Sequence, residues 1–357
     1  MYYFLFSSSK AAFNLLKYPV VVVLCFALAS CSGNILPGIS NSPQCQSSCV
    51  VGSGVQGVQV LIEPDDGEQV ITNAIGSAQR SIWLEIYILS DRNVIRALEE
   101  AANRGLDVRV MLEPHPFGGG SSPSKTLDTL AASGIKTQFT NPSFPLTHEK
   151  GMITDNTTAY IMTSNFSRSA LGGSSGYRNR EYGIIDTIKQ DVLATEEIFM
   201  ADWNHSTVKF NDPNLVVSPI NSRNDFTTLI NSARSTLLIE AEEMIDSDIE
   251  QAIANAAQHG VQVEVILPIA NTSSGDSSSQ GIATIKQGGV QVREDAQLYM
   301  HAKIIVVDNK VAFVGSENIS AQSLNQNREL GIIVSDPSAL NRIQTTFQYD
   351  WGVSQNV

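Results

Sequence analysis

Apolar and polar positions follow a regular order along the chain beyond residue 58. Amphipathic segments predict helices, and the short apolar or β-branched runs between them predict strands. Gly105 follows one such segment as a helix-stop signal. The expected helices cover 67–79, 92–104 and 124–133, and the expected strands cover 81–88, 108–112 and 135–139. This alternation predicts an α/β fold with mixed sheets flanked by helices.

The same order of elements occurs twice. Residues 74–88 match residues 229–243 at a spacing of 155, and 97–114 match 252–268 in the same way. The spacing falls to 148 at the last matches, as expected if surface loops differ in length. The predicted repeats cover residues 59–205 and 206–357. Packing of the repeats about a pseudo-two-fold axis would leave a cleft at their seam.

The N-terminus reads as a targeting segment. Residues 1–17 contain two lysines and no acids, and residues 18–30 form an apolar run. The run is shorter than the ~20 residues that span a bilayer and fits the apolar region of a signal peptide, so residues 1–30 are predicted to be one. It ends in Leu28-Ala29-Ser30-Cys31, which resembles a bacterial lipobox with Cys31 as the lipidated new N-terminus. An ordinary cleaved signal peptide or an uncleaved anchor are the alternatives.

Residues 31–58 are rich in Ser, Gly, Pro, Asn and Gln, which predicts a flexible tether. Cys45 and Cys49 lie within it, and an oxidising compartment would permit a disulfide between them. Together with the lipobox, this predicts an exported lipoprotein that is anchored to a membrane of the bacterial envelope.

Composition narrows the class of protein. The 357 residues are 42% hydrophobic and 17% charged, which excludes wholesale disorder. The net charge is −13, and residues 31–357 hold 21 basic against 36 acidic side chains. This net charge argues against a surface that binds nucleic acid phosphates in general. It does not exclude a local basic cleft.

A spaced set of polar residues occurs once in each repeat. Repeat one contains His148-x-Lys150-x4-Asp155, followed by Met162-Thr163-Ser164-Asn165. Repeat two contains His301-x-Lys303-x4-Asp308, followed at the same spacing by Gly315-Ser316-Glu317-Asn318. Two such matches at corresponding places of a duplication indicate a functional site rather than chance.

These motifs resemble those of the phospholipase D superfamily, whose signature HxKx4Dx6GSxN is usually present twice. The Asn-Arg-Glu-x-Gly segments at 179–183 and 327–331 also look like the family's downstream region. Repeat one departs from the signature at Met162 and Thr163, although Thr keeps the hydroxyl. The resemblance implies the family fold, with the active site at the seam, and a covalent phosphohistidine. By that resemblance, His148 attacks phosphorus and His301 is the general acid.

The residue types suit phosphodiester chemistry. His148 and Lys150 are two positions apart, as are His301 and Lys303, so in extended chain each pair shares a face. The lysines can bind the phosphate, together with hydroxyl and amide donors that stabilise charge on its oxygens. The expected hydroxyl and amide donors are Thr163, Ser316, Asn165 and Asn318. These donors replace the metal that other phosphodiesterases use, so we expect no metal and no cofactor.

Each catalytic histidine needs an acceptor that fixes its tautomer. Glu181 and Glu329 are the candidates, in the same repeat as their histidine or in the other; an ion pair with Arg180 or Arg328 is the structural alternative. The remaining acids of the motifs, Asp155 and Asp308, are expected to tie down the turns after the motif strands.

Several phosphodiester reactions fit this site. We expect a phospholipase D that hydrolyses a phospholipid to phosphatidic acid, because a membrane tether would hold it beside its substrate. A metal-independent endonuclease and a cardiolipin synthase-type phosphatidyltransferase are the alternatives. A non-catalytic binding module is disfavoured because both motifs are intact. The expected partners are therefore a phospholipid and, through the lipid anchor, a membrane; nucleic acid is disfavoured and a monomer is expected.

Overall fold

The computed structural model describes residues 53–117, 122–173, 176, 178–269 and 277–357. The predicted signal peptide, the lipobox cysteine Cys31 and the pair Cys45 and Cys49 lie outside these residues. In the described part of the chain, no helix is long and apolar enough to cross a membrane.

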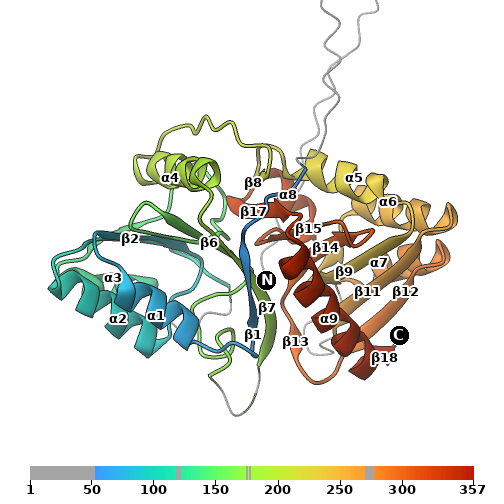
Figure 1. Cartoon of the computed structure of the whole chain (residues 1–357), viewed down its shortest axis with the longest axis horizontal. Coiled ribbons are helices and arrows are strands. Elements are labelled where there is room, and N and C mark those ends of the chain that lie inside the picture. The colour runs from blue at the N-terminus through green and yellow to red at the C-terminus, as the bar shows by residue number, and fades with distance from the viewer. Residues whose placement is uncertain (1–52, 118–121, 174–175, 177, 270–276) are drawn as a thin grey trace, which may run out of the picture. The chain divides into compact units, whose positions relative to one another are not determined.

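Repeat one forms a mixed sheet between two layers of helices (Figure 1). Parallel pairs join β2–β3 and β3–β4, and the other neighbours within the repeat are antiparallel, in the order β1-β7-β6-β5-β2-β3-β4. The strands are β1 (Gln59–Glu63), β2 (Ser81–Ile86), β3 (Asp107–Leu112), β4 (Lys136–Phe139), β5 (Lys150–Thr154), β6 (Thr158–Met162) and β7 (Asn179–Asp186). The helices are α1 (Gln69–Ser77), α2 (Arg92–Asn103), α3 (Pro123–Ala132) and α4 (Lys189–Trp203). Helices α1 to α3 cover one face and α4 covers the other.

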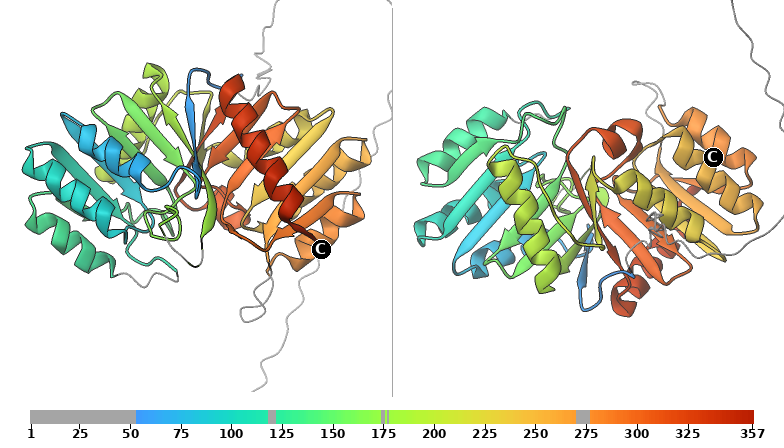
Figure 2. Two further views of the ribbon diagram at one scale, coloured as in Figure 1. Left: turned by 60° about the horizontal axis from the view of Figure 1, so that its bottom comes forward. Right: turned by 90° about the horizontal axis from the view of Figure 1, so that it is seen from above.

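Repeat two has the same arrangement, in the order β18-β12-β11-β9-β14-β15-β17-β8. The strands of this sheet are β8 (Leu215–Ser218), β9 (Thr236–Ala241), β11 (Gln262–Pro268), β12 (Gln291–Asp295), β14 (Lys303–Val307), β15 (Val311–Gly315), β17 (Glu329–Val334) and β18 (Gln355–Asn356). Helices α5 (Ser222–Ser232), α6 (Ser247–Gln258) and α7 (Ser279–Gln287) cover one face, and α9 (Pro337–Val353) covers the other (Figure 2). The short elements are β10 (Met244–Ile245), β13 (Tyr299–Met300), β16 (Ile319–Ser320) and α8 (Ala321–Asn325). The predicted α/β class with two tandem repeats is confirmed.

One hydrophobic cluster joins the two sheets. It includes Ile62 and Ile184 from repeat one and Ile304 and Ile332 from repeat two, all fully buried. Phe347 of α9 belongs to the same cluster, so this helix packs at the seam. Because each sheet buries one face against this cluster, the histidine motifs of β5 and β14 are brought to one place.

The folded part begins before the predicted end of the tether. Val55 forms a parallel bridge with Val334: its amide donates to the Ile333 carbonyl at 3.0 Å, and its carbonyl accepts from the Ser335 amide at 2.8 Å. Val55 and Val58 are buried in the seam cluster. The expected tether 31–58 is therefore corrected: its last residues are structural, because two valines within the polar composition fill the edge of the core.

Candidate active site

At the seam, a short segment of each repeat pairs with the backbone of the other repeat. Thr147 bridges to Arg328, and the amide of His148 donates to the Arg328 carbonyl at 2.8 Å. In the other direction, β13 pairs in parallel with the start of β7, at Asn179 and Arg180. Each histidine is thus held against the Asn-Arg-Glu segment of the other repeat.

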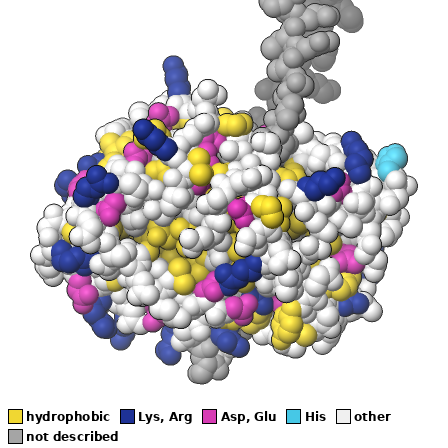
Figure 3. Space-filling view, in the orientation of Figure 1, with side chains coloured by type: hydrophobic (Ala, Val, Ile, Leu, Met, Phe, Trp, Pro, Cys, Tyr) yellow, Lys and Arg dark blue, Asp and Glu magenta, His cyan; other side chains and the backbone are white. Residues whose placement is uncertain are grey.

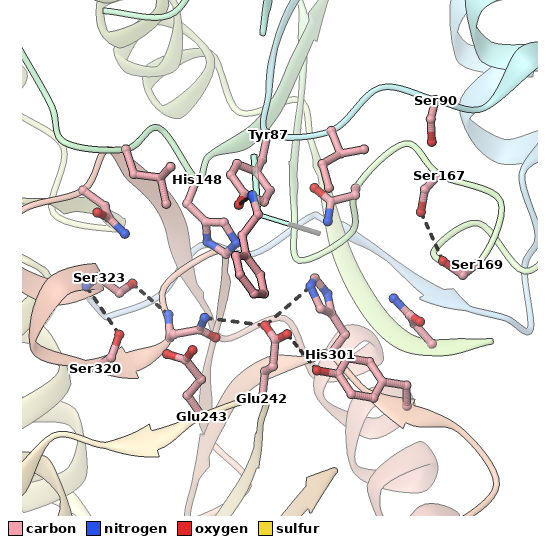
Figure 4. A pocket seen from close by; sticks show the side chains of 18 of the residues that line it. Tyr87, Ser90, His148, Ser167, Ser169, Glu242, Glu243, His301, Ser320 and Ser323 are labelled. Atoms are coloured by element: carbon pink, nitrogen blue, oxygen red, sulfur yellow. Dashed lines mark hydrogen bonds and ion pairs between the residues drawn. The ribbon is translucent and has the colours of Figure 1, made fainter. Parts of the chain in front are cut away.

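This exchange decides which glutamate orients which histidine. Nδ1 of His148 lies 3.0 Å from Glu329 Oε2, and Nδ1 of His301 lies 2.8 Å from Glu181 Oε1. Both glutamates are fully buried, whereas both histidines line the cleft (Figure 4). Each glutamate therefore serves the histidine of the opposite repeat and leaves that ring's Nε2 for chemistry.

The motif hydroxyls support the glutamates instead of lining the cleft. Thr163 Oγ1 donates to Glu181 Oε2 at 2.6 Å and accepts from the Tyr182 amide at 2.9 Å. Ser316 accepts from the Leu330 amide at 3.0 Å and hydrogen-bonds Glu329. Both hydroxyl residues are fully buried. This corrects the expectation that Thr163 and Ser316 contact phosphate: β6 and β15 place them beneath the histidines.

Repeat one accommodates Met162 at the place where repeat two has Gly315. Met162 pairs with Gly183 on the neighbouring strand, and a Cβ at Gly183 would lie only 2.9 Å from Met162 Cγ. The missing side chain at Gly183 therefore makes room for the methionine, so the departure from the signature leaves the strand pair intact.

The motif lysines are buried beside the histidines and do not line the cleft themselves. Lys150 Nζ donates to the carbonyl of His148 and lies 5.1 Å from the centre of the Tyr87 ring. Lys303 Nζ donates to the carbonyl of His301 at 2.7 Å. Burial lowers the pKa of Lys150 to about 7; the Glu329 charge opposes this shift and the Lys303 charge adds to it. Lys150 can therefore gain or lose its proton near neutral pH.

Burial and neighbouring charges shift the pKa of His148. Burial lowers the pKa of His148; the charge of Glu329 opposes this shift, and the charge of Lys150 adds to it. A neutral imidazole can attack phosphorus, so this direction suits a nucleophile.

A cleft of about 1260 Å³ contains the reactive face of both histidines. Asn165 and Asn318 line it, as expected for donors to a phosphate. Its repeat-one wall adds Ile88, Ile95, Phe117 and Leu146 together with Arg92 and Lys125. The cleft can therefore hold a phosphodiester between the histidines and an apolar group on the repeat-one side.

Glu242 is a cleft residue that the sequence patterns did not single out. Its Oε2 lies 2.8 Å from Lys303 Nζ and 3.4 Å from His301 Nε2. Burial alone would raise the pKa of Glu242, but the charges of His301 and Lys303 outweigh it and hold that pKa well below the usual range. Alignment of the repeats pairs Glu242 with Tyr87. This difference between the repeats was the sequence feature from which the site residue could have been found.

The sequence analysis also did not identify Asp202 and Asp350 as partners of the motif arginines. Arg180 pairs with Asp350 through bonds of 2.6 and 2.8 Å, and Arg328 Nε lies 2.7 Å from Asp202. Both arginines bind an aspartate of the other repeat, which excludes the alternative in which Arg180 or Arg328 pairs with Glu181 or Glu329. The repeated Asp-Trp pairs at 202–203 and 350–351 carried this signal.

The last motif acids lie away from the cleft. Asp155 accepts from the amides of residues 79–81 and Asp308 from those of residues 234–236. Both have positive φ, 56° and 52°. They fix the turns after β5 and β14 to the loops before β2 and β9.

Among the described residues, one acidic group has the spacing of metal ligands. Oxygens of Glu85, Glu149 and Asp202 lie within 4.8 Å of one another in the interior. Burial raises the pKa of Glu149 to about 8, with the charge of Asp202 adding to the shift, and burial likewise raises the pKa of Glu85. None of the three lines the cleft, and Arg328 already neutralises Asp202. The group is therefore separate from the phosphodiester site.

Solved structures share this architecture. A polyphosphate kinase from Porphyromonas gingivalis superposes with a TM-score of 0.64 at 17% identity and covers 84% of this chain and 48% of its own. A phosphatidylserine synthase from Haemophilus influenzae gives a TM-score of 0.63 at 14% identity and covers 85% of this chain and 88% of its own. At these identities the likeness concerns the fold.

Sequence comparison gives the family. The major cardiolipin synthase of Bacillus subtilis is 25% identical over an alignment of 341 residues that covers 84% of this chain and 69% of that protein. The family described as "Cardiolipin synthase, PLD-like domain" matches residues 71–203 and 226–351, so each match contains one histidine motif. The chain therefore belongs to the phospholipase D superfamily, in the cardiolipin synthase, PLD-like domain family.

Proposed function

We propose that the protein is a phosphatidyltransferase that moves a phosphatidyl group from a glycerophospholipid to an alcohol through a phosphohistidine on His148. The observation that carries this is the pair of histidines held by glutamates from opposite repeats at a cleft whose repeat-one wall includes apolar side chains. Similarity to cardiolipin synthases favours transfer over the hydrolysis expected from the sequence.

In the first step, Nε2 of His148 bonds to phosphorus while Nε2 of His301 gives a proton to the departing alcohol oxygen. Asn165 and Asn318, which line the cleft, supply donors to the phosphoryl oxygens, and the buried lysines Lys150 and Lys303 supply positive charge beside them. In the second step the oxygen of an acceptor alcohol bonds to phosphorus, the bond from phosphorus to Nε2 of His148 breaks, and the alcohol proton passes to Nε2 of His301. When water takes the place of this alcohol, the product is phosphatidic acid, which is the phospholipase D reaction and the second candidate function.

Nuclease activity has weaker support. The net charge of the chain is −13, and Glu242 and Glu243 line the cleft. On the face seen in Figure 3, lysine and arginine side chains are scattered among acidic ones and form no continuous basic surface. A polyanion would gain little from such a surface.

We further propose that lipidation of Cys31 anchors the protein at a membrane of the bacterial envelope, which would keep the cleft near lipid. The support is the sequence of the targeting segment.

Vesicles of phosphatidylethanolamine with added glycerol, in excess chelator, test the proposed function. We expect phosphatidylglycerol by mass spectrometry, with phosphatidic acid as the product of the water reaction. His148→Ala should abolish both. His301→Ala should still release p-nitrophenol from bis(p-nitrophenyl) phosphate, because an activated leaving group needs little protonation. Absence of both lipid products, or an adduct on neither histidine after rapid quenching, would contradict the proposal.

A further inference from the structure

Three exposed apolar side chains lie along the edge of the sheets that carries the cleft. Phe117 of repeat one is 92% exposed and Ile245 of repeat two is 39% exposed, and both line the cleft. Ile269 is 48% exposed and directly follows β11, which pairs in parallel with β9. Because parallel strands end at the same edge of a sheet, and Glu242 after β9 lines the cleft, Ile269 belongs to this edge. We call Phe117, Ile245 and Ile269 the apolar rim.

The backbone at Phe117 is fixed relative to the active site. Its amide donates to the hydroxyl of Tyr87 at 2.5 Å. Tyr87 is buried, and its ring meets the ring of His148 edge-on with 4.7 Å between centroids (Figure 4). A ring on a fixed backbone loses less conformational entropy on entering an apolar phase than a ring on a free loop. The exposed Phe117 ring is therefore prepared for a contact outside the chain.

The cations of the cleft lie on the same side as Phe117. Arg92 and Lys125 are exposed and line the cleft from repeat one. The acidic side chains among the described lining residues, Glu242 and Glu243, belong to repeat two. At a membrane surface, apolar side chains enter the acyl region while lysine and arginine stay with anionic headgroups. The repeat-one rim combines both kinds of group.

The position of the rim favours a bilayer as its partner. Single exposed apolar side chains are common on proteins, so their presence alone carries no meaning. Here they come from both repeats and lie at a cleft that can hold a phosphodiester together with an apolar group. A bilayer presents these same two groups at its surface, and the cations match its anionic lipids.

We propose that the apolar rim, together with Arg92 and Lys125, docks the cleft against a bilayer that contains anionic phospholipid, with the Phe117 ring in the acyl region. The proposal deepens the proposed function and rests on it for the role of the cleft, whereas the contact itself needs no turnover. It is distinct from the anchor on Cys31: a lipid there would hold the protein at a membrane, and the rim would set which face meets that membrane.

A tryptophan at the rim reports this contact. Phe117→Trp is made in the full chain with Cys31→Ser, so that the proposed anchor cannot hold the protein at the vesicle. We expect blue-shifted emission, and quenching by brominated acyl chains, on vesicles of phosphatidylcholine with phosphatidylglycerol. Tyr349→Trp is the matched control, because Tyr349 is 61% exposed on α9 and does not line the cleft. It should stay unquenched, and the chain without either reporter gives the background of its three own tryptophans.

The charge of the rim is tested in the same assay. Arg92→Ala combined with Lys125→Ala should raise the vesicle concentration for half-maximal quenching about threefold or more, because two cations leave the anionic surface. Lys189→Ala is the control: Lys189 is an exposed lysine on α4 and does not line the cleft. It should leave that concentration unchanged.

A turnover measurement separates docking from chemistry. Ile269→Asp should raise the apparent KM for vesicle phospholipid about threefold or more, because an apolar contact is replaced by a charge. The same variant should release p-nitrophenol from bis(p-nitrophenyl) phosphate at the unaltered rate, since Ile269 does not line the cleft.

Absence of quenching at position 117 on anionic vesicles would overturn the proposal, as would equal quenching of both reporters. Blue-shifted emission at position 117 before vesicles are added would also overturn it, because another protein surface, such as a second copy of the chain, would then cover the rim. Equal quenching with and without phosphatidylglycerol would remove the role of Arg92 and Lys125. Quenching at position 117 without any lipid product would remove the proposed function and leave the docking contact in place.

Discussion

At the scale of single residues, burial sets the charge of Lys150. The ammonium has lost most of its water, and its pKa of about 7 reflects that loss more than any single neighbour. A phosphate in the cleft would restore favourable charge beside it. The free protein and the substrate complex should therefore differ in how they respond to pH.

We expect kcat/KM for a chromogenic phosphodiester to fall above about pH 7, because Lys150 is cationic below its pKa and neutral above it. The same limb should lie at higher pH in kcat, since the bound phosphate stabilises the ammonium. Lys150→Arg should remove the limb near pH 7, because a guanidinium keeps its charge. A limb at the same pH in Lys150→Arg would show that a group other than Lys150 titrates there.

At the scale of elements, the turn after β5 and the turn after β14 are each fixed by an aspartate to the loop before a neighbouring strand. Asp308 has φ of 52°, and its carboxylate accepts from the amides of residues 234–236. Burial would raise its pKa, but these hydrogen bonds outweigh it and lower the pKa of Asp308 to about 2. The turn thereby ties β14, which begins at Lys303, to the start of β9.

Asp308→Ala should lower the free energy of unfolding by about 1–3 kcal/mol, since several amides lose their acceptor. Asp308→Asn should cost less, because Asn tolerates positive φ and keeps one oxygen. The contribution of Asp308 is present above the pKa of the unfolded carboxyl and is lost as pH falls towards about 2. Denaturant titrations of the two variants at several pH values measure this. Equal stability of Asp308→Ala and the unaltered protein at pH 7 would contradict the anchoring role.

At the scale of the whole molecule, the repeats complete each other. Glu181 and Glu329 orient histidines across the seam, and Arg180 and Arg328 bind aspartates across it. Each histidine therefore has its orienting carboxylate only when the repeats are docked. The seam cluster and the active site are parts of one contact.

The predicted targeting segment belongs to the same scale, because the proposed lipid anchor would keep the cleft near membrane lipid. Cys31→Ser should move the protein from the membrane fraction to the soluble fraction, since a serine cannot carry the thioether-linked lipid. Cys45→Ser, outside the lipobox, is the matched control and should leave the distribution unchanged. Fractionation with mass analysis of the N-terminal peptide measures both. Unchanged partition together with an unlipidated N-terminus in the unaltered protein would refute the anchor.

The sequence by itself predicted the α/β class, the duplication and the histidine motifs. These features are local: strand and helix periodicity and the His-x-Lys spacing are written in neighbouring residues. Strand β2 was expected to reach residue 88 and ends at Ile86, where Tyr87 and Ile88 turn into the cleft. Apolar runs do not mark where a strand leaves its sheet.

Only the tertiary structure decided which residues of the site contact one another. The contact of His148 with Glu329 joins residues 181 positions apart, and that of His301 with Glu181 joins residues 120 apart. Spacing along a chain carries no information about such pairs, because the docking of two sheets sets them. For the same reason only the structure showed that Thr163 and Ser316 hydrogen-bond the glutamates and that Glu242 lies 3.4 Å from Nε2 of His301.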